Sequence, residues 1–332
     1  MPTQTDAPIK SGAFTAPQVS VVFMGTPEFA ATSLQSLIDD KYHIVGVVTQ
    51  PDRKMGRERI ITTSPVKNVA LQNNLNILQP EKLDSEVVET IRSWKPDVII
   101  VAAYGRILPE TLLSLPGFGC LNIHASILPC WRGASPVVNA LIAGDRETGI
   151  TLMELDRGMD TGATIAFDKT EIGDNERAPE LLNRLATMGA KLLAKTLPLW
   201  IKRQVTAIPQ PEEGATLCEL IEREDGHIFW NMEAEAIYNR YRGLYPWPGI
   251  FTYWKRGDDD VVRMKFHEIT RQKTAPAVAY PVGSVVEIGE KVGIITGAGV
   301  IFPLTVQIEG KESVAIENFI AGYPQFIGSV LM

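Results

Sequence analysis

An amide and an imidazole two residues apart, followed later by a carboxylate, are the side chains of this sequence best suited to chemistry. Asn122 and His124 stand in an apolar run, residues 120–124, that predicts a buried strand. Side chains two apart on a strand leave the same face, so these polar groups point together. A second predicted strand, residues 149–155, leads to Asp160 on a glycine-bracketed turn. We expect Asn122, His124 and Asp160 to meet at the ends of adjacent strands.

Each of these residues has a simpler structural explanation when it is taken alone. A strand histidine is more often a core or surface group than a catalyst, Asn122 could bind a backbone carbonyl, and Asp160 could stabilise its turn. A proline-containing turn and the basic turn Trp131-Arg132-Gly133 separate the three residues along the chain. The combination favours a catalytic site over three unrelated structural roles.

The three side chains together suit acyl transfer. The Asn122 amide can donate to an oxyanion without carrying charge. An imidazole titrates near pH ~6.5, so His124 can move protons, and Asp160 can orient the ring and stabilise its protonated form. Cys130 is an alternative, covalent nucleophile, but it would need His124 as its base. Ser126 lacks the GxSxG pattern of a nucleophile elbow.

A strand–helix–strand pattern at residues 19–49 predicts the parallel α/β sheet that positions these groups. Its first turn, residues 25–29, reads GTPEF instead of GxGxxG, which argues against a dinucleotide site. A central strand over residues 97–103 leads into a turn that contains Tyr104, Gly105 and Ile107. Ligands bind at such carboxyl ends of parallel strands, although a plain connecting loop is the alternative.

A basic loop, residues 50–63, follows the second strand and therefore lies on the same side of the predicted sheet. A solvated surface loop is the simple interpretation. The local positive charge in an otherwise acidic chain favours phosphate contacts instead. The basic residues concerned are Arg53, Lys54, Arg57 and Arg59.

The chain is long enough for two domains. Its 332 residues exceed what one core comfortably organises. We expect a disordered N-terminus at residues 1–17, a catalytic domain at 18–203, a Pro/Gly-rich linker at 204–215 and a C-terminal domain at 216–332. Short strands between glycine turns predict a small β-barrel for the last of these.

Composition restricts the functions available. A net charge of −7 argues against nucleic-acid binding through bulk charge, although a local basic patch remains open. Three unpatterned cysteines indicate reduced thiols and no zinc site. The N-terminus lacks a secretory signal, and the apolar runs are too short to span a bilayer. We therefore expect a cytoplasmic protein with no membrane association and no metal.

The site residues resemble a known signature. Asn122-x-His124, Ser126-Ile127-Leu128-Pro129, Trp131-Arg132-Gly133 and Asp160 are similar to the motif of the 10-formyltetrahydrofolate-dependent formyltransferases. From about Val19 onward the chain resembles the branch of that family that acts on methionyl-tRNA. The resemblance implies a Rossmann-like catalytic domain and an OB-like C-terminal domain that contacts tRNA, and we expect a monomer. It further implies formyl transfer from 10-formyltetrahydrofolate to the α-amino group of methionyl initiator tRNA for translation initiation.

The resemblance also assigns roles to individual positions. It implies that Asn122, His124 and Asp160 are catalytic and that the basic loop reaches the acceptor end of the tRNA. Cys130 is a departure, since the family usually has a basic residue there, whereas the basic Arg132 is retained as a tRNA contact. The positions implied to contact the folate are Tyr104, Gly105, Ile107, Ser126, Ile127, Leu128 and Pro129.

Other functions remain open from the residues alone. The same fold and folate could serve an amino-sugar acceptor, or water in a hydrolase-like relative. The basic loop and the C-terminal domain favour a macromolecular acceptor. A non-catalytic RNA-binding or scaffold protein is a further alternative, and the presence of all three polar side chains weighs against it.

Overall fold

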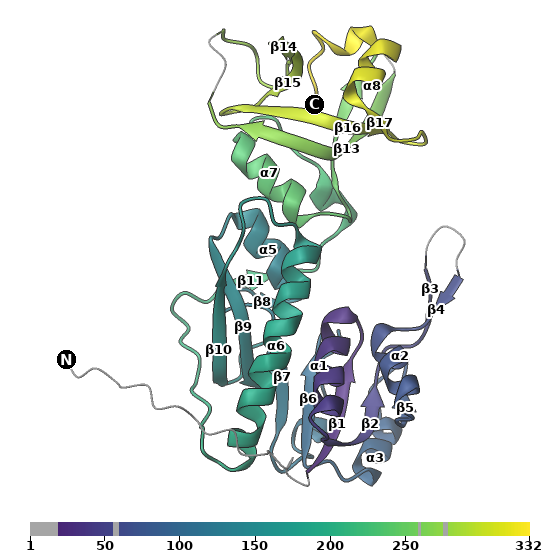
Figure 1. Cartoon of the computed structure of the whole chain (residues 1–332), viewed down its shortest axis with the longest axis vertical. Coiled ribbons are helices and arrows are strands. Elements are labelled where there is room, and N and C mark those ends of the chain that lie inside the picture. Colours follow the sequence, from purple (N-terminus) through teal and green to yellow (C-terminus); the bar gives the residue numbers. More distant parts are fainter. Residues whose placement is uncertain (1–18, 56–59, 258–259, 275–277) are drawn as a thin grey trace, which may run out of the picture. The chain divides into compact units, whose positions relative to one another are not determined.

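The computed structural model describes residues 19–55, 60–257, 260–274 and 278–332 (Figure 1). The predicted disordered N-terminus and two of the basic-loop residues, Arg57 and Arg59, lie outside these ranges. The chain divides into two compact units. The first contains the described residues up to Tyr104 together with Leu108–Leu121 and Leu193–Thr206, and the second contains Gly105–Ile107, Asn122–Leu192 and Ala207–Met332.

The first unit is built on a parallel sheet, as its sequence predicts. Strand β1 pairs in parallel with β2 and β6, and β2 pairs in parallel with β5, in the order β7-β6-β1-β2-β5. The apolar residues of β1 and β6 are buried, which explains their uninterrupted apolar sequence. The strands are β1 (Ser20–Gly25), β2 (His43–Val48), β5 (Ile77–Leu78), β6 (Val98–Ala102) and the start of β7 (Cys120–His124).

Local signals fix the helices of this unit. The Ser64 hydroxyl accepts the Lys67 N–H and caps α2, and Asp84 caps α3 in the same way. Pro27 is the N-cap of α1. The helices are α1 (Glu28–Asp39), α2 (Pro65–Gln72), α3 (Ser85–Ser93), the unpredicted α4 (Glu110–Leu113) and the end of α6 (Ala178–Ile201).

The basic loop contains regular structure that its sequence does not predict. Strands β3 (Arg53–Met55) and β4 (Ile60–Thr62) pair in antiparallel register. Next to them, Lys67 Nζ lies 2.5 Å from Asp52 Oδ2, and Gln79 Nε2 donates to the other carboxylate oxygen at 2.8 Å. The prediction of a simple loop is therefore wrong for residues 53–55 and 60–62, which form two paired strands.

One part of the second unit, residues 122–192, continues from the end of β7 and is called its catalytic half below. Strand β9 (Glu147–Glu154) pairs antiparallel with β10 (Thr164–Glu171), in the order β10-β9-β7. Helix α5 (Pro136–Ala143) precedes β9, and α6 follows β10. A two-stranded parallel ladder joins β8 (Arg132–Gly133) to β11 (Leu217–Cys218), two segments far apart in the sequence.

The C-terminal part of the second unit is an antiparallel sheet with helices. Its strands are ordered β12-β13-β16-β15-β14, with β17 beside β16. The aromatic side chains of Trp254, Phe319 and Phe326 pack edge to face in its core. The elements are η1 (Arg223–Gly226), α7 (Ala234–Gly243), β12 (Ile250–Lys255), β13 (Val261–Gln272), β14 (Val285–Ile288), β15 (Lys291–Ile295), β16 (Val300–Ile308), β17 (Val314–Ala315), α8 (Ile316–Gly322) and η2 (Pro324–Phe326).

The final residues join the two edges of this sheet. The Val285 N–H on β14 donates to the Ser329 carbonyl at 2.9 Å, and the Met332 N–H donates to the Tyr253 carbonyl on β12 at 3.0 Å. Residues 328–332 thus satisfy backbone groups on both edge strands. Closing a sheet in this manner removes exposed edges, which is the property of the predicted small barrel.

A loop at residues 172–177 attaches helix α7 to the catalytic half of the second unit. The buried Arg242 guanidinium donates to the carbonyls of Gly173 at 2.9 Å and Glu176 at 3.2 Å. The Tyr238 hydroxyl donates to Asn175 Oδ1 at 2.9 Å. Hydrogen bonds from a buried charge are among the stronger ones in proteins, so this loop is firmly held.

Glu176 in the same loop gives the fold a pH-dependent element. Burial raises the pKa of Glu176, but hydrogen bonds from Arg184 and from the Gly173 N–H outweigh burial and leave the pKa below its ordinary value. A carboxyl group of this kind stabilises the fold above its unfolded-state pKa of about 4.3, and that contribution is lost as pH falls through the lower folded-state value.

We expect Glu176→Gln to lower the midpoint of thermal unfolding at pH 7 and to cost progressively less as the pH falls below about 4. Thermal melts of both proteins between pH 7 and pH 3 measure this difference. The exposed Glu213 supplies a matched control, since Glu213→Gln should change little at any pH. A penalty for Glu176→Gln that stays constant over the whole range would contradict the assignment.

Candidate active site

The second unit brings Asn122, His124 and Asp160 together. His124 Nδ1 lies 3.6 Å from Asp160 Oδ2, and Asn122 Nδ2 donates to Asp160 Oδ1 at 3.4 Å. Asn122 and His124 are 9% and 5% exposed, so the site is nearly closed to bulk water. The alternation of β7 explains the arrangement, because it turns both polar side chains to the face on which Asp160 lies.

The other nitrogen of His124 is also engaged. His124 Nε2 lies 2.9 Å from the Trp131 carbonyl oxygen. A carbonyl only accepts, so Nε2 carries a proton in this contact and Nδ1 faces the carboxylate. Proton exchange with a substrate through Nε2 therefore requires the ring to give up its contact with Trp131.

The backbone around Asp160 fixes its carboxylate. Asp160 Oδ2 accepts the Gly133 N–H at 2.9 Å. Asp160 itself has a φ of 54°, a left-handed conformation that aspartate tolerates better than most residues do. Within the same turn, Asp156 Oδ1 accepts the Gly158 N–H at 2.9 Å and the Thr161 hydroxyl at 2.8 Å. Side-chain and backbone contacts thus hold the turn from both sides.

The loop from Ser126 to Pro129 is anchored in the protein interior. The fully buried Ser126 donates its hydroxyl to the Cys130 carbonyl at 2.5 Å. Thr151 Oγ1 donates to the Ser126 carbonyl at 2.7 Å and accepts the Leu128 N–H at 3.1 Å. Ile127 and Pro129 are partly exposed. Hydrogen bonds therefore anchor the loop at Ser126 and Leu128, whereas Ile127 and Pro129 remain accessible.

The remaining predicted folate residues belong to different units. Gly105 and Ile107 lie in the second unit, where Ile107 is 67% exposed. Space is open around Gly105, because a Cβ built there would meet no atom within 4 Å. Tyr104 lies in the first unit, where its carbonyl accepts from Gln50 Nε2 at 3.0 Å.

The predicted tRNA residues have contrasting surroundings. Arg53 is exposed at the start of β3, and Lys54 follows it in the same strand. Arg132, by contrast, is only 4% exposed. Its Nε donates to Gln210 Oε1 at 3.0 Å, and its Nη1 lies 3.3 Å from a Glu212 carboxylate oxygen. Arg132 therefore differs from the hairpin residues, because its guanidinium already has partners inside the fold.

Cys130 is not paired with His124, because the ring nitrogens of that histidine face Asp160 and the Trp131 carbonyl. The Cys130 side chain is exposed, and its thiol lies 3.7 Å from the Gly214 carbonyl. We expect Cys130→Ser to retain activity within about twofold of the wild type, since the backbone carbonyls of Cys130 and Trp131, which Ser126 and His124 contact, remain in place. Steady-state kinetics with and without a thiol-alkylating reagent measures this. Loss of activity in the serine variant would revive covalent catalysis.

Several groups at the site come from the predicted linker, residues 204–215, and from the first residues of the predicted C-terminal domain. The Trp131 N–H donates to Thr216 Oγ1 at 2.8 Å, and Gln210 contacts the Asp160 turn. The Cys218 thiol donates to the Trp131 carbonyl at 3.5 Å. Burial raises the pKa of the Cys218 thiol, and the charge of Asp160 raises it further. A Pro/Gly-rich, polar sequence carries no periodicity that would reveal these contacts.

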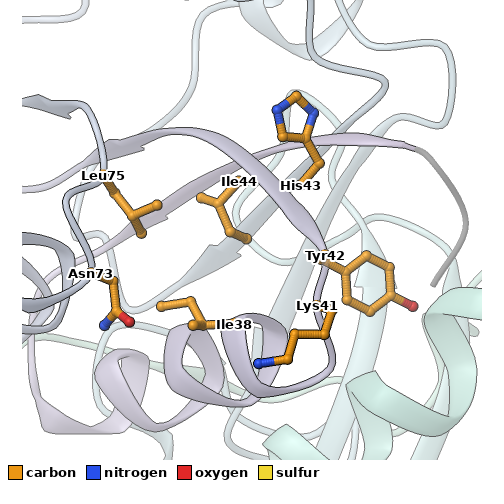
Figure 2. Close-up of a pocket in the computed structure, with 7 residues that line it drawn as sticks. All are labelled: Ile38, Lys41, Tyr42, His43, Ile44, Asn73 and Leu75. Atoms are coloured by element: carbon orange, nitrogen blue, oxygen red, sulfur yellow. The ribbon is translucent and has the colours of Figure 1, made fainter. Parts of the chain in front are cut away.

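A separate open hollow of about 480 Å³ lies in the first unit (Figure 2). It surrounds the beginning of β2, where His43 is the first strand residue. Ligands of parallel sheets bind at the opposite, carboxyl ends of the strands. The hollow is lined by Ile38, Lys41, Tyr42, His43, Ile44, Asn73 and Leu75.

Neither a metal site nor a membrane span is found in the described ranges. No three His, Cys, Asp or Glu side chains within them gather so that they could hold a metal ion. Within the same ranges, no helix combines the length and apolar character needed to cross a bilayer.

Comparison with known proteins decides the family. The model of the formyl transferase family matches residues 18–197, and that of the formyl transferase C-terminal domain matches residues 220–324. A methionyl-tRNA formyltransferase of Acetivibrio thermocellus is 39% identical over 314 residues, which cover 94% of this chain and 99% of that protein. The chain belongs to the methionyl-tRNA formyltransferase family. A relative of the same name from Caldicellulosiruptor saccharolyticus is 40% identical over 318 residues, covering 94% and 100% of the two chains.

A solved structure supports the fold. The N-formyltransferase of Helicobacter canadensis, in complex with folinic acid and dTDP-3-aminofucose, matches with a TM-score of 0.64. The match covers 86% of this chain and 98% of that one at 17% identity. The predicted Rossmann-like fold of the N-terminal part and the β-rich C-terminal domain are confirmed as the formyltransferase fold.

Proposed function

We propose that this protein transfers the formyl group of 10-formyltetrahydrofolate to the α-amino group of methionyl initiator tRNA. The observation that carries the proposal is the near-complete match to methionyl-tRNA formyltransferases, in a chain whose Asn122, His124 and Asp160 meet in one site. The product, N-formylmethionyl-tRNA, serves translation initiation in the cytoplasm.

The three side chains have distinct tasks in this reaction. The free amine attacks the formyl carbon, the formyl oxygen becomes an oxyanion, and the folate nitrogen leaves with a proton. Asn122 uses one N–H on Asp160 and has a second for the oxyanion. His124 transfers the proton, and the negative charge of Asp160 stabilises the protonated, positively charged ring. The substrate amine is less basic than a lysine, so positioning and oxyanion stabilisation dominate over base strength.

The second unit offers groups that suit the folate. The exposed apolar Ile107 and the open backbone at Gly105 can lie against a flat ring system. The anchored loop from Ser126 to Pro129 presents Ile127 and Pro129 at its surface. We assign the folate to these residues, whereas Tyr104 stays a prediction. The H. canadensis enzyme was solved with folinic acid, a formylated folate, which is in keeping with such a donor.

The basic hairpin suits the acceptor end of a tRNA. Arg53 is exposed, and Lys54, Arg57 and Arg59 follow it closely in the sequence. The Asp52–Lys67 ion pair and the Asp52–Gln79 hydrogen bond hold the base of this hairpin. Phosphate contacts from such a segment position the substrate without reading its sequence.

The decisive experiment offers the protein and 10-formyltetrahydrofolate three acceptors: methionyl initiator tRNA, free methionine and a dTDP-linked amino sugar. We expect formylation of the charged tRNA alone, with a KM that rises with salt because phosphates are contacted. Preferential formylation of the sugar would replace the acceptor and keep the catalytic site. Release of formate with every acceptor would indicate a hydrolase. No turnover, with retained tRNA binding, would indicate an RNA-binding protein.

A further inference from the structure

Gln210 is bound to the backbone of the catalytic turn. Its Nε2 donates to the carbonyl of Asp160 at 2.8 Å and to the carbonyl of Gly162 at 2.7 Å. Its Oε1 accepts from Nε of the buried Arg132 at 3.0 Å. All of these residues belong to the second unit. One side chain from the supposed linker thus spans the turn that carries the catalytic carboxylate.

This set of contacts allows only one orientation of the amide. Both N–H groups face carbonyl oxygens, and the amide oxygen faces a guanidinium. Rotating the amide by 180° would place oxygen against oxygen and N–H against Arg132, so all contacts would be lost. Glu212 lies 3.3 Å from the guanidinium of Arg132 on its other side and holds it in place.

The turn needs such support because its backbone is unusual. Asp160 is a non-glycine residue in the left-handed region, with a φ of 54°. Gly162 passes so close to the Glu154 carbonyl that a Cβ would lie 1.8 Å from it. The two carbonyls that Gln210 binds belong to Asp160 and Gly162, so the hydrogen bonds fix the backbone from which the carboxylate projects.

We propose that Gln210 is a positioning residue, which holds the Asp160 turn so that the carboxylate faces His124 and Asn122, with Arg132 fixing the Gln210 amide. This inference goes beyond the proposed function, because it assigns a catalytic-site role to the segment between the two family domains. It also gives Arg132 a task inside the protein, in place of a direct contact with tRNA.

The sharpest test separates the donor half of Gln210 from its acceptor half. In Gln210→Glu the carboxylate still pairs with Arg132, but it cannot donate to the two carbonyls. Gln210→Met keeps the length of the side chain and removes every hydrogen bond. We expect kcat at saturating substrates to fall at least about tenfold in both variants, since a displacement of about 1 Å can cost about a hundredfold. KM for tRNA and for folate should stay within about twofold.

Stability separates positioning from a merely structural role. We expect Gln210→Glu to melt closer to the wild type than Gln210→Met does, because its ion pair with Arg132 is retained, and yet to lose at least as much kcat. Gln204→Met, an exposed residue of the same segment, is the matched control and should keep both properties. Wild-type kcat in Gln210→Glu, or losses of kcat that simply follow losses of thermal stability, would overturn the proposal.

Two further readouts complete the design. In Arg132→Lys we expect the same fall in kcat with no change in the salt dependence of KM, whereas a phosphate contact would raise KM and reduce its salt slope. Hydrogen exchange should be faster over residues 156–164 in both Gln210 variants. This exchange measurement requires no substrate, so it remains informative even if the acceptor assignment fails, and unchanged exchange would overturn the proposal by itself.

Discussion

Asp160→Asn is expected to lower kcat by about 10³- to 10⁴-fold while the protein stays folded, by analogy with other sites in which a carboxylate supports an imidazole. The carboxylate accepts the Gly133 N–H and faces Nδ1 of His124. The asparagine amide has the same shape but no negative charge to stabilise a protonated imidazole. Its NH2 group is a donor and would replace one of the two acceptor oxygens of the carboxylate. Single-turnover formylation of methionyl-tRNA measures the chemical step directly.

A matched control lies in the same turn. Asp156 is exposed and accepts the Gly158 N–H and the Thr161 hydroxyl, both of which an asparagine oxygen can still receive. Asp156→Asn should therefore keep kcat within about threefold. Equal losses of kcat in the two variants would show that any change to this turn is damaging, and would contradict a special role for Asp160.

Asn122→Ala is expected to lower kcat by about 10²- to 10³-fold with little change in either KM, the size typical for loss of one oxyanion donor. Among the described residues, the Asn122 side chain makes a single hydrogen bond, at 3.4 Å with Asp160, so most of its donor capacity is available for the transition state. The same single-turnover assay, with circular dichroism to confirm folding, measures the effect. The exposed Asn183 on α6 provides the control variant Asn183→Ala. Retention of most activity would remove Asn122 from the oxyanion site.

The sequence predicted that Asn122 and His124, two of the candidate catalytic residues, lie together, because this depends on a simple periodicity. Two polar residues at i and i+2 in a buried strand must share a face, and β7 has this arrangement. The parallel sheet of the first unit was equally predictable, since buried parallel strands form continuous apolar runs. Both inferences use only neighbouring residues and the geometry of regular structure.

What the sequence could not predict depends on contacts between distant segments. An arginine is a typical phosphate contact. Strand β8, however, pairs with β11, some 85 positions further along the chain, and this pairing buries Arg132 against Gln210. Nothing in the Pro/Gly-rich segment distinguishes a flexible connector from an ordered one. The hairpin of β3 and β4 was missed for another reason, because strands of three residues are too short to show alternation.

The ladder between β8 and β11 limits how this protein can be divided or recombined. The two family domains end and begin at residues 197 and 220, which leaves Gln210, Thr216 and Cys218 outside both. A fragment cut at residue 203 would lose those groups and, with them, the hydroxyl and carbonyl of Thr216 that accept the backbone N–H groups of Trp131 and Arg132. Chimeras that exchange C-terminal domains should therefore be joined after Cys218, so that the candidate active site is inherited together with the connector that completes it.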